Sequence, residues 1–174
     1  METLVHHLKS RHCDLTLHRP WLDEENNVAT FPLWNLSGQM VGYQQYRPDA
    51  SKTQNNDPKL GRYFTLRKQP TLALFGVESL HLTPKVVFLT EGVFDACRLT
   101  ERGVSALAVL SCDVNREYRG WLRALNRRVV AVCDNDEAGR KLAKFGDEAV
   151  FMAEKDLGDS SDEEVTELLR KYGL

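Results

Sequence analysis

The sequence predicts an α/β protein in which a parallel sheet flanked by helices follows a small α+β unit. In the second half of the chain, short runs that are apolar throughout alternate with segments of helical character. Strands of this kind are buried on both faces, as in a parallel sheet covered by helices. In the first half, β-rich runs separated by a turn indicate an antiparallel hairpin. The pattern changes near residues 81–85, so we predict one domain at 1–84 and another at 85–174.

The N-terminal unit is expected to begin with a helix and to continue as strands. Residues 2–11 place their apolar side chains on one helical face. Four strands are then expected, at residues 28–33, 39–47, 62–66 and 71–75. Residues 35–38 (NLSG) have the composition of a hairpin turn. The polar residues 49–60 have little to bury, so we expect a loop there.

The second half should contain four strands and four helices in alternation. The strands are expected at residues 86–90, 105–110, 129–133 and 149–153, and the helices at residues 94–101, 116–125, 137–145 and 161–172. Four large side chains predict the buried stripe of the second helix, namely Tyr118, Trp121, Leu122 and Leu125. Ser161 and Glu164 have the spacing of a capping box, which marks the start of the last helix.

Composition restricts the class of protein. The chain has 174 residues, of which 42% are hydrophobic and 28% charged, which is typical of a globular fold. Its net charge of −2 means that any contact with nucleic acid must depend on local charge. The four cysteines form no CxxC pair, so no zinc site is expected and the thiols should stay reduced. Without an apolar run of bilayer length or a signal peptide, the protein is expected to be cytoplasmic and to have no membrane partner.

Three acidic residues lie at the ends of expected strands, two of them directly after the strand and Asp136 two residues further on. Glu91 comes after the run VVFLT, and Asp134 and Asp136 come after VVAVC. If these two strands are neighbours, the carboxylates meet at one edge of the sheet, where open α/β sheets bind ligands. Their mutual repulsion is relieved by a hard divalent cation such as Mg²⁺, with Mn²⁺ as an alternative. The competing interpretation is that each acid only caps the helix that follows it.

Two motifs at these positions resemble a known family. Residues 91–96 read EGVFDA and residues 134–140 read DNDEAGR, and together they are similar to the two motifs of toprim domains. The resemblance covers residues 86–159 and implies a toprim-like parallel sheet that binds magnesium. The DNDEAGR form is most similar to that of bacterial and phage-type DNA primases, including phage primase–helicases.

The resemblance implies roles for individual acids. Glu91 corresponds to the catalytic or general-base acid near the first metal, and Asp134 and Asp136 correspond to metal ligands that serve catalysis. Asp95 corresponds to a supporting acid at the catalytic centre. Lys155-Asp156 followed by Asp159 resembles a later primase element, which implies that Asp156 helps to hold a second metal.

The first half extends the resemblance toward primases. Residues 31–33 (FPL), Gly38, residues 41–42 (VG) and residues 46–47 (YR) follow the order of a primase pattern. The implied activity is that of a DNA primase, a nucleotidyltransferase that makes short RNA primers on single-stranded DNA from ribonucleoside triphosphates. A separate helicase or template-recognition protein is an implied partner. If the chain is phage-encoded, the compartment is the host cytoplasm.

Basic residues supply what an acidic metal site lacks. Triphosphates and a template need cationic partners, and our candidates are Arg47, Lys59 and Arg62. Tyr63 is positioned nearby in the sequence to stack on a base. A second basic stripe flanks Trp121 and is either a binding surface or a solvated face, and it comprises Arg116, Arg119, Arg123, Arg127 and Arg128.

Two other functions remain open at this point. A toprim nuclease uses the same acids to cut DNA or RNA, so a primase assay separates it by the lengthening or shortening of the nucleic acid. A non-catalytic toprim module of a replication or defence complex predicts that Glu91→Gln leaves biological activity intact. Topoisomerase activity is disfavoured because none of the tyrosines has a recognisable nucleophile context.

Overall fold

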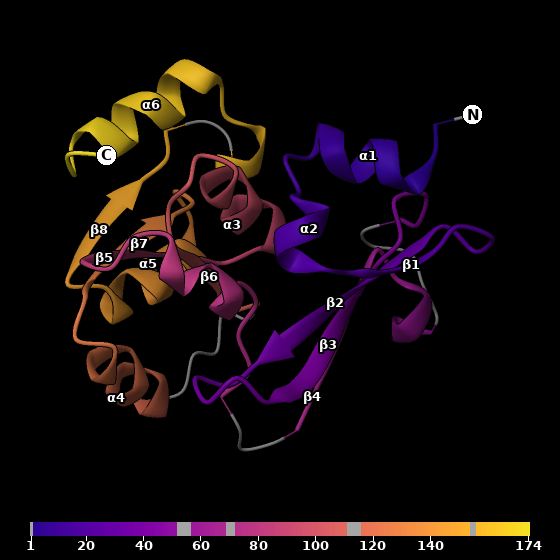
Figure 1. Ribbon diagram of the computed structural model, residues 1–174, viewed down its shortest axis with the longest axis horizontal. Helices are drawn as coiled ribbons and strands as arrows, with labels where there is room; N and C mark the ends of the chain where they lie inside the picture. Colours follow the sequence, from indigo (N-terminus) through magenta and orange to yellow (C-terminus); the bar gives the residue numbers. More distant parts are fainter. Residues whose placement is uncertain (1, 52–56, 69–71, 111–115, 154–155) are drawn as a thin grey trace.

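The fold consists of an antiparallel sheet in the first half of the chain and a parallel sheet in the second half (Figure 1). The computed structural model describes residues 2–51, 57–68, 72–110, 116–153 and 156–174. Helices cover both faces of the parallel sheet (Figure 1). The predicted α/β class, with a parallel sheet after a smaller α+β unit, is therefore confirmed. None of the helices in the described ranges is both long and apolar enough to cross a membrane.

The N-terminal sheet has four antiparallel strands in the order β1-β2-β3-β4. Its elements are α1 (Leu4–Ser10), α2 (Leu15–His18), β1 (Trp21–Asp23), β2 (Val28–Trp34), β3 (Met40–Tyr46), η1 (Pro58–Leu60) and β4 (Tyr63–Arg67). The predicted turn between β2 and β3 is held by Asn35, whose Oδ1 accepts from the N–H groups of Ser37 at 3.0 Å and Gln39 at 2.9 Å. Gly38 adopts φ 75°, which favours glycine.

The parallel sheet has the strand order β6-β5-β7-β8. Its elements are η2 (Val77–His81), β5 (Val86–Thr90), α3 (Val93–Thr100), β6 (Ala106–Ala108), α4 (Arg116–Ala124), β7 (Arg128–Cys133), α5 (Glu137–Leu142), η3 (Ala143–Phe145), β8 (Glu148–Phe151), η4 (Leu157–Asp159) and α6 (Asp162–Arg170). Every residue of β5 is buried, which matches its unbroken apolar sequence. The predicted capping box of the last helix is present, with Ser161 as N-cap and Glu164 at N3.

One hydrophobic core joins the two halves. Phe31 of β2 packs edge-on against Phe75 and Phe94, with ring centroids 5.6 and 6.1 Å apart. Tyr46 of β3 lies 4.8 Å from the same Phe94 ring. Such pairs contribute about 0.5–1.5 kcal/mol each beyond their buried area. They hold the antiparallel sheet against α3 and so against the carboxyl edge of the parallel sheet. The domain boundary at 84/85 stays a prediction.

Several local expectations were wrong. In place of a strand at 71–75, the described residues 72–75 form two isolated bridges, Trp34–Leu74 and Phe75–Ala108, which link the two sheets. Trp121 is 47% exposed and does not belong to the buried stripe of α4. The short elements α2 and β1 were not predicted, because three or four residues carry too little periodicity to be recognised. The expected loop 49–60 falls partly outside the described residues and ends in η1.

Candidate functional site: an acidic edge of the parallel sheet

Glu91 and Asp134 lie at the same edge of the parallel sheet. Glu91 follows the last residue of β5, and Asp134 follows the last residue of β7. These strands are direct neighbours in parallel register, with Leu89 opposite Ala131. The condition on which the sequence argument rested is therefore met, because the carboxyl ends of adjacent parallel strands face the same side.

The acids at this edge affect one another's pKa. Burial raises the pKa of Glu91, and the negative charges of Asp134, Asp136 and Asp156 raise it further. Burial also raises the pKa of Asp134, with further contributions from Asp156 and Asp136. Four carboxylates from three separate segments thus form one electrostatic group. Such a group favours a cation between its members.

Asp136 has a different local position from Asp134. Its side chain caps α5, and its Oδ1 accepts from the N–H of Gly139 at 2.7 Å. Asp136 is exposed, whereas Asp134 is partly buried. The capping role that the sequence left open is therefore present at Asp136. It occupies one carboxylate oxygen and leaves the other without a hydrogen bond among the described residues.

The glycines of the two motifs are required by close packing, and neither adopts a left-handed backbone. A Cβ at Gly139 would lie 2.0 Å from the carbonyl oxygen of Asp134, so any larger residue would displace the backbone that carries this acid. A Cβ at Gly92 would lie 2.8 Å from Oδ2 of Asp95. Gly92 itself has an extended backbone, with φ −106°. The lack of space for a Cβ, rather than a left-handed backbone, therefore explains glycine at these two positions.

Asp95 connects two segments of the acidic edge. Its Oδ2 accepts from the N–H of Gly92 at 3.1 Å, and its Oδ1 accepts from the N–H of Gly158 at 2.8 Å. Burial raises the pKa of Asp95 to about 6, against the lowering effect of these hydrogen bonds. Asp95 therefore holds the turn after Glu91 against η4, the short helix that follows Asp156.

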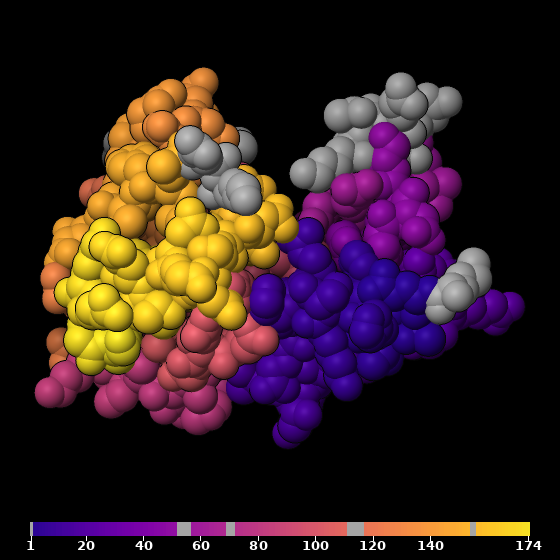
Figure 2. Space-filling view, turned by 90° about the horizontal axis from the view of Figure 1, so that it is seen from above, coloured from indigo at the N-terminus to yellow at the C-terminus, as the bar shows by residue number. Residues whose placement is uncertain are grey.

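A cavity of about 260 Å³ opens at this edge, between the two halves of the chain. It is lined by Arg11, Gln44, Tyr63, Glu91, Gly92, Val93, Phe94, Asp95, Leu110, Asp134 and Asp156. The space-filling view shows a hollow between the indigo-to-magenta half and the orange-to-yellow half (Figure 2). The cavity thus brings together the acids of the parallel sheet and polar side chains of the N-terminal unit.

Arg11 and Gln44 are lining residues that the sequence argument missed. Arg11 is the C-cap residue of α1, and its guanidinium lies 4.7 Å from the centre of the Phe94 ring and 3.4 Å from Asp159. Its Nε is buried and has no hydrogen-bond partner in the described part of the chain. No motif or spacing marks Arg11, because 80 or more residues separate it from the acids it faces.

Of the four residues predicted to bind nucleotide or template, only Tyr63 is among the described residues that line the cavity. Tyr63 lines the cavity, and burial raises its pKa to about 12. Arg47 and Arg62 are neighbours just beyond the β3–β4 pair, joined by a backbone hydrogen bond of 2.9 Å from Arg47 N to Arg62 O. Lys59 is exposed on η1. Arg62 precedes Tyr63 directly and Arg47 is hydrogen-bonded to Arg62, but none of the three cations lines the cavity itself.

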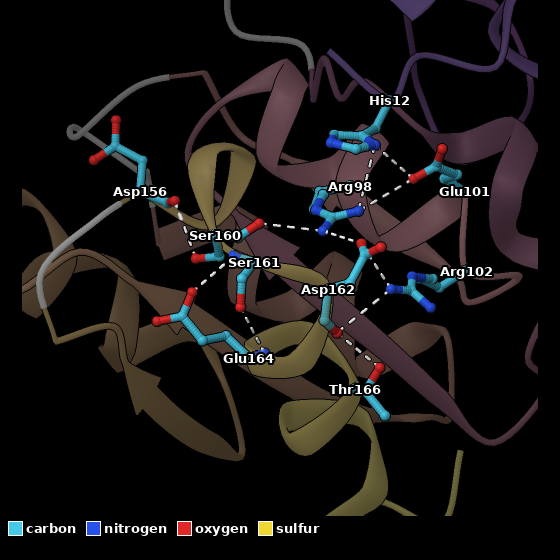
Figure 3. Close-up of polar contacts among 10 residues, drawn as sticks. All are labelled: His12, Arg98, Glu101, Arg102, Asp156, Ser160, Ser161, Asp162, Glu164 and Thr166. Carbon is cyan, nitrogen blue, oxygen red and sulfur yellow. Dashed lines mark hydrogen bonds and ion pairs between the residues drawn. The ribbon is translucent and has the colours of Figure 1, made fainter. Parts of the chain in front are cut away.

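A buried arginine ties the segment after Asp156 to α3 (Figure 3). Arg98 is 2% exposed. Its Nη2 donates to the carbonyl of Ser160 at 3.1 Å and to Asp162 at 2.5 Å. Its Nη1 lies 3.2 Å from Glu101, which also pairs with His12 at 2.7 Å. Three segments distant in sequence therefore meet at one guanidinium, on the helix that begins at the acidic edge.

The donor set at the edge fits a hard divalent cation. Carboxylate oxygens are the ligands that Mg²⁺ prefers, and Glu91, Asp134 and Asp156 line one cavity. Within the described residues, however, no three His, Cys, Asp or Glu side chains are grouped closely enough to hold a metal ion. Glu91 and Asp134 thus share an edge and a cavity, whereas Asp136 does not line that cavity, and the described residues form no closed coordination cluster. The role of the three acids as metal ligands stays a prediction.

Comparison with known proteins agrees with this geometry. Residues 88–155 match a family described as toprim-like. The chain is 34% identical over 127 residues to a DNA primase of Thermotoga maritima, an alignment that covers 68% of this chain and 21% of the relative. The chain thus spans about a fifth of the length of the curated relative it matches.

Solved primase structures share the fold. The RNA polymerase domain of Mycobacterium tuberculosis primase, in complex with double-stranded DNA, matches with a TM-score of 0.62 and 18% identity over 94% of this chain and 59% of that chain. The primase fragment of the bacteriophage T7 primase-helicase protein matches with a TM-score of 0.62 and 17% identity over 89% of this chain and 69% of that chain. At these identities the likeness concerns the fold alone.

Proposed function

We propose that this chain, which carries a toprim-like domain and resembles the catalytic cores of DNA primases, catalyses magnesium-dependent nucleotidyl transfer in primer synthesis. One observation carries the proposal: Glu91 and Asp134 lie at the ends of adjacent parallel strands, in a cavity that also contains Arg11 and Tyr63. Acids for metal binding and a cation for phosphate binding are the two requirements of this chemistry.

The acids divide between metal binding and support. Glu91, Asp134 and Asp136 would hold Mg²⁺, with Asp156 contributing to a second ion. When bound, Mg²⁺ or Mn²⁺ lowers the pKa of the attacking 3′-hydroxyl and neutralises charge on the triphosphate. Asp95 positions the backbone on either side of this group through Gly92 and Gly158. Holding these acids in one group costs energy in the free protein, as their raised pKa values indicate.

The N-terminal unit supplies the contacts to substrate and template. Arg11 lines the same cavity as Glu91 and Asp134, where it is paired with the exposed Asp159, and its planar guanidinium would bind triphosphate oxygens. Tyr63 is 42% exposed at the cavity and would stack on a base. Arg47, Arg62 and Lys59 would then contact the template backbone next to it. The M. tuberculosis relative was solved with DNA, which supports a nucleic-acid substrate for this fold.

A primer-synthesis assay tests the proposal. The protein is incubated with single-stranded DNA of mixed sequence, labelled ribonucleoside triphosphates and Mg²⁺, and the products are separated by length. Primase activity requires labelled oligoribonucleotides that disappear with chelator and with Glu91→Gln. The matched control is Glu163→Gln, which removes an exposed carboxylate on α6 that does not line the cavity.

The same reactions distinguish the other functions. Shortening of end-labelled DNA without new RNA product would identify a toprim nuclease using the same acids. If neither activity is found and Glu91→Gln leaves the biological activity of the protein intact, the chain is a binding module. Either result would overturn the primase proposal.

A further inference from the structure

A second cavity, of about 710 Å³, lies at the opposite edge of the parallel sheet from the acids. It is bounded by α4, η3 and the first residues of β7 and β8, where Arg128 and Glu148 begin the two strands. Arg128 precedes Asp134 by six residues. At about 3.3 Å per residue of strand, the two sites are roughly 20 Å apart.

The cavity is strongly basic. Five cationic side chains line it, namely Arg119, Arg123, Arg127, Arg128 and Lys144. Among the described residues, only two acids line it, Asp147 and Glu148. It therefore has an excess of positive charge in a chain whose net charge is −2. A concentration of one sign of charge in a hollow surface attracts ligands of the opposite sign.

Most of this charge is not neutralised by ion pairs. Arg119 donates to the carbonyl of Lys144, and Arg127 donates to the carbonyls of Leu80 and, at 3.0 Å, of Thr83. Carbonyl partners fix the guanidinium groups in place but leave their positive charge uncompensated. Among the lining cations, only Arg128 is paired with an acid in the described part of the chain, at 2.6 Å from Nε to Glu148.

Two of the cations are available to a ligand. The side chains of Arg123 on α4 and Lys144 on η3 make no hydrogen bond or ion pair with any residue that the structure describes. Both residues are exposed. Guanidinium and ammonium groups that converge on one hollow are suited to phosphate oxygens. The surrounding arginines are already held by backbone carbonyls, so less ordering is needed when a ligand binds.

The lining favours recognition of phosphate over recognition of a base. The one aromatic side chain among the lining residues that the structure describes is Phe145, and the guanidinium of Arg119 lies 5.6 Å from its ring centre. That face of the ring is therefore covered and cannot stack on a base. A ligand bound here through its phosphates would be bound without regard to sequence.

We propose that this cavity binds the phosphate backbone of a single-stranded nucleic acid, at a site separate from the acidic edge. The site does not depend on the proposed reaction, because it contains the cations and carbonyls described and none of the acids of that edge. It would hold a nucleic-acid strand roughly 20 Å from the acids, at the other end of the β-strands.

Fluorescence anisotropy of a labelled single-stranded oligonucleotide, measured in chelator, tests this site. Arg123→Glu with Lys144→Glu is compared with Lys9→Glu with Arg19→Glu, which reverses one lysine and one arginine at exposed positions of the N-terminal unit. We expect the cavity variant to bind at least tenfold more weakly and the control less than twofold. The slope of log K against log salt should become shallower by about 0.7 for each phosphate that the variant no longer neutralises.

A second variant, a folding check and a second ligand complete the test. Arg123→Gln with Lys144→Gln should show a smaller loss in the same direction, and circular dichroism checks that each variant is folded. An equal loss in cavity and control variants, or no loss in either, would overturn the proposal. A loss of affinity for labelled ATP with unchanged binding of the oligonucleotide would also overturn it, because the site would then take free triphosphate. The measurement is made without metal, so a failed primase assay does not affect it.

Discussion

Asp95 accepts a hydrogen bond from the backbone N–H of Gly158 at 2.8 Å, across 63 residues of chain. The same carboxylate accepts from Gly92, the residue after Glu91. A single partly buried acid therefore fixes the relative positions of the two segments that carry Glu91 and Asp156. Burial raises the pKa of Asp95 to about 6, so near neutral pH the protein holds a charge that burial disfavours.

Asp95→Asn should change the pH dependence of stability. In the unfolded chain Asp95 loses its proton near pH 3.8, whereas the folded protein keeps it until about pH 6. The folded state thus binds more protons than the unfolded state between these pH values. The contribution of Asp95 to the free energy of unfolding therefore falls as pH rises through this window, by on the order of 1–3 kcal/mol. Asp95→Asn should remove that fall, which denaturant unfolding from pH 3.5 to 7.5 measures.

The control for this prediction is Glu25→Gln, which removes an exposed carboxylate of the N-terminal unit. Its pH profile should match that of the native chain. An asparagine has one acceptor oxygen for two N–H donors, so Asp95→Asn should also lose one hydrogen bond at every pH. A profile for Asp95→Asn that is parallel to the native one would show that Asp95 does not titrate in this window.

The sequence allowed the acidic edge to be predicted because its signals are local. An apolar run followed at once by an acid identifies a strand end, and β5 and β7 were found in this way. The partners of Arg98 and Arg11 could not be found, since Ser160 and Phe94 lie 62 and 83 residues away from them. A contact between residues so far apart in the chain leaves no periodic pattern in a single sequence.

Arg98→Met should loosen η4 more than it disturbs the rest of the fold. The substitution removes the buried donors to Ser160 and Asp162, and charged hydrogen bonds of this kind contribute about 1.5–3 kcal/mol each. We expect a loss of roughly 2–3 kcal/mol in the free energy of unfolding. Hydrogen exchange should also be faster at the N–H of Gly158, which donates to Asp95.

Arg102→Met is the matched control for this variant. Arg102 contacts the same Asp162 at 2.8 Å but is partly exposed, so its loss should cost less than about 1 kcal/mol. It should leave the exchange of the Gly158 amide unchanged. Equal protection of Gly158 in the two variants would mean that Arg98 does not position the segment after Asp156.

Glu91→Gln should have opposite effects with and without metal. In chelator at pH 7 the variant should be slightly more stable than the native chain, because it removes a partly buried charge that Asp134 and Asp156 repel. With Mg²⁺ at about 100 times its dissociation constant, the native chain should gain about 2.7 kcal/mol and the variant far less. Thermal unfolding with and without Mg²⁺ measures both effects. Equal stabilisation of the two proteins by Mg²⁺ would show that Glu91 does not bind the metal.

Arg11→Gln should weaken substrate binding without affecting the metal. The residue faces the acids but contributes a cation, so its loss should raise KM for the triphosphate at least tenfold while Mg²⁺ stabilises the variant as before. Arg11→Lys should restore binding only in part, since an ammonium lacks the planar pair of donors. A change in kcat with unchanged KM would contradict a role in holding the substrate.

Asp136 combines a structural role with a proposed role at the metal, and two substitutions separate them. Asp136→Ala removes the N-cap of α5 and should cost about 1 kcal/mol, because the N–H of Gly139 loses its acceptor. Asp136→Ser keeps a capping oxygen, so it should retain native stability in chelator while losing the charge. If Asp136 binds Mg²⁺, both variants should lose the stabilisation by Mg²⁺ to the same extent. If Asp136 only caps the helix, Asp136→Ser should respond to Mg²⁺ as the native chain does. The proposed ligands would then be Glu91, Asp134 and Asp156.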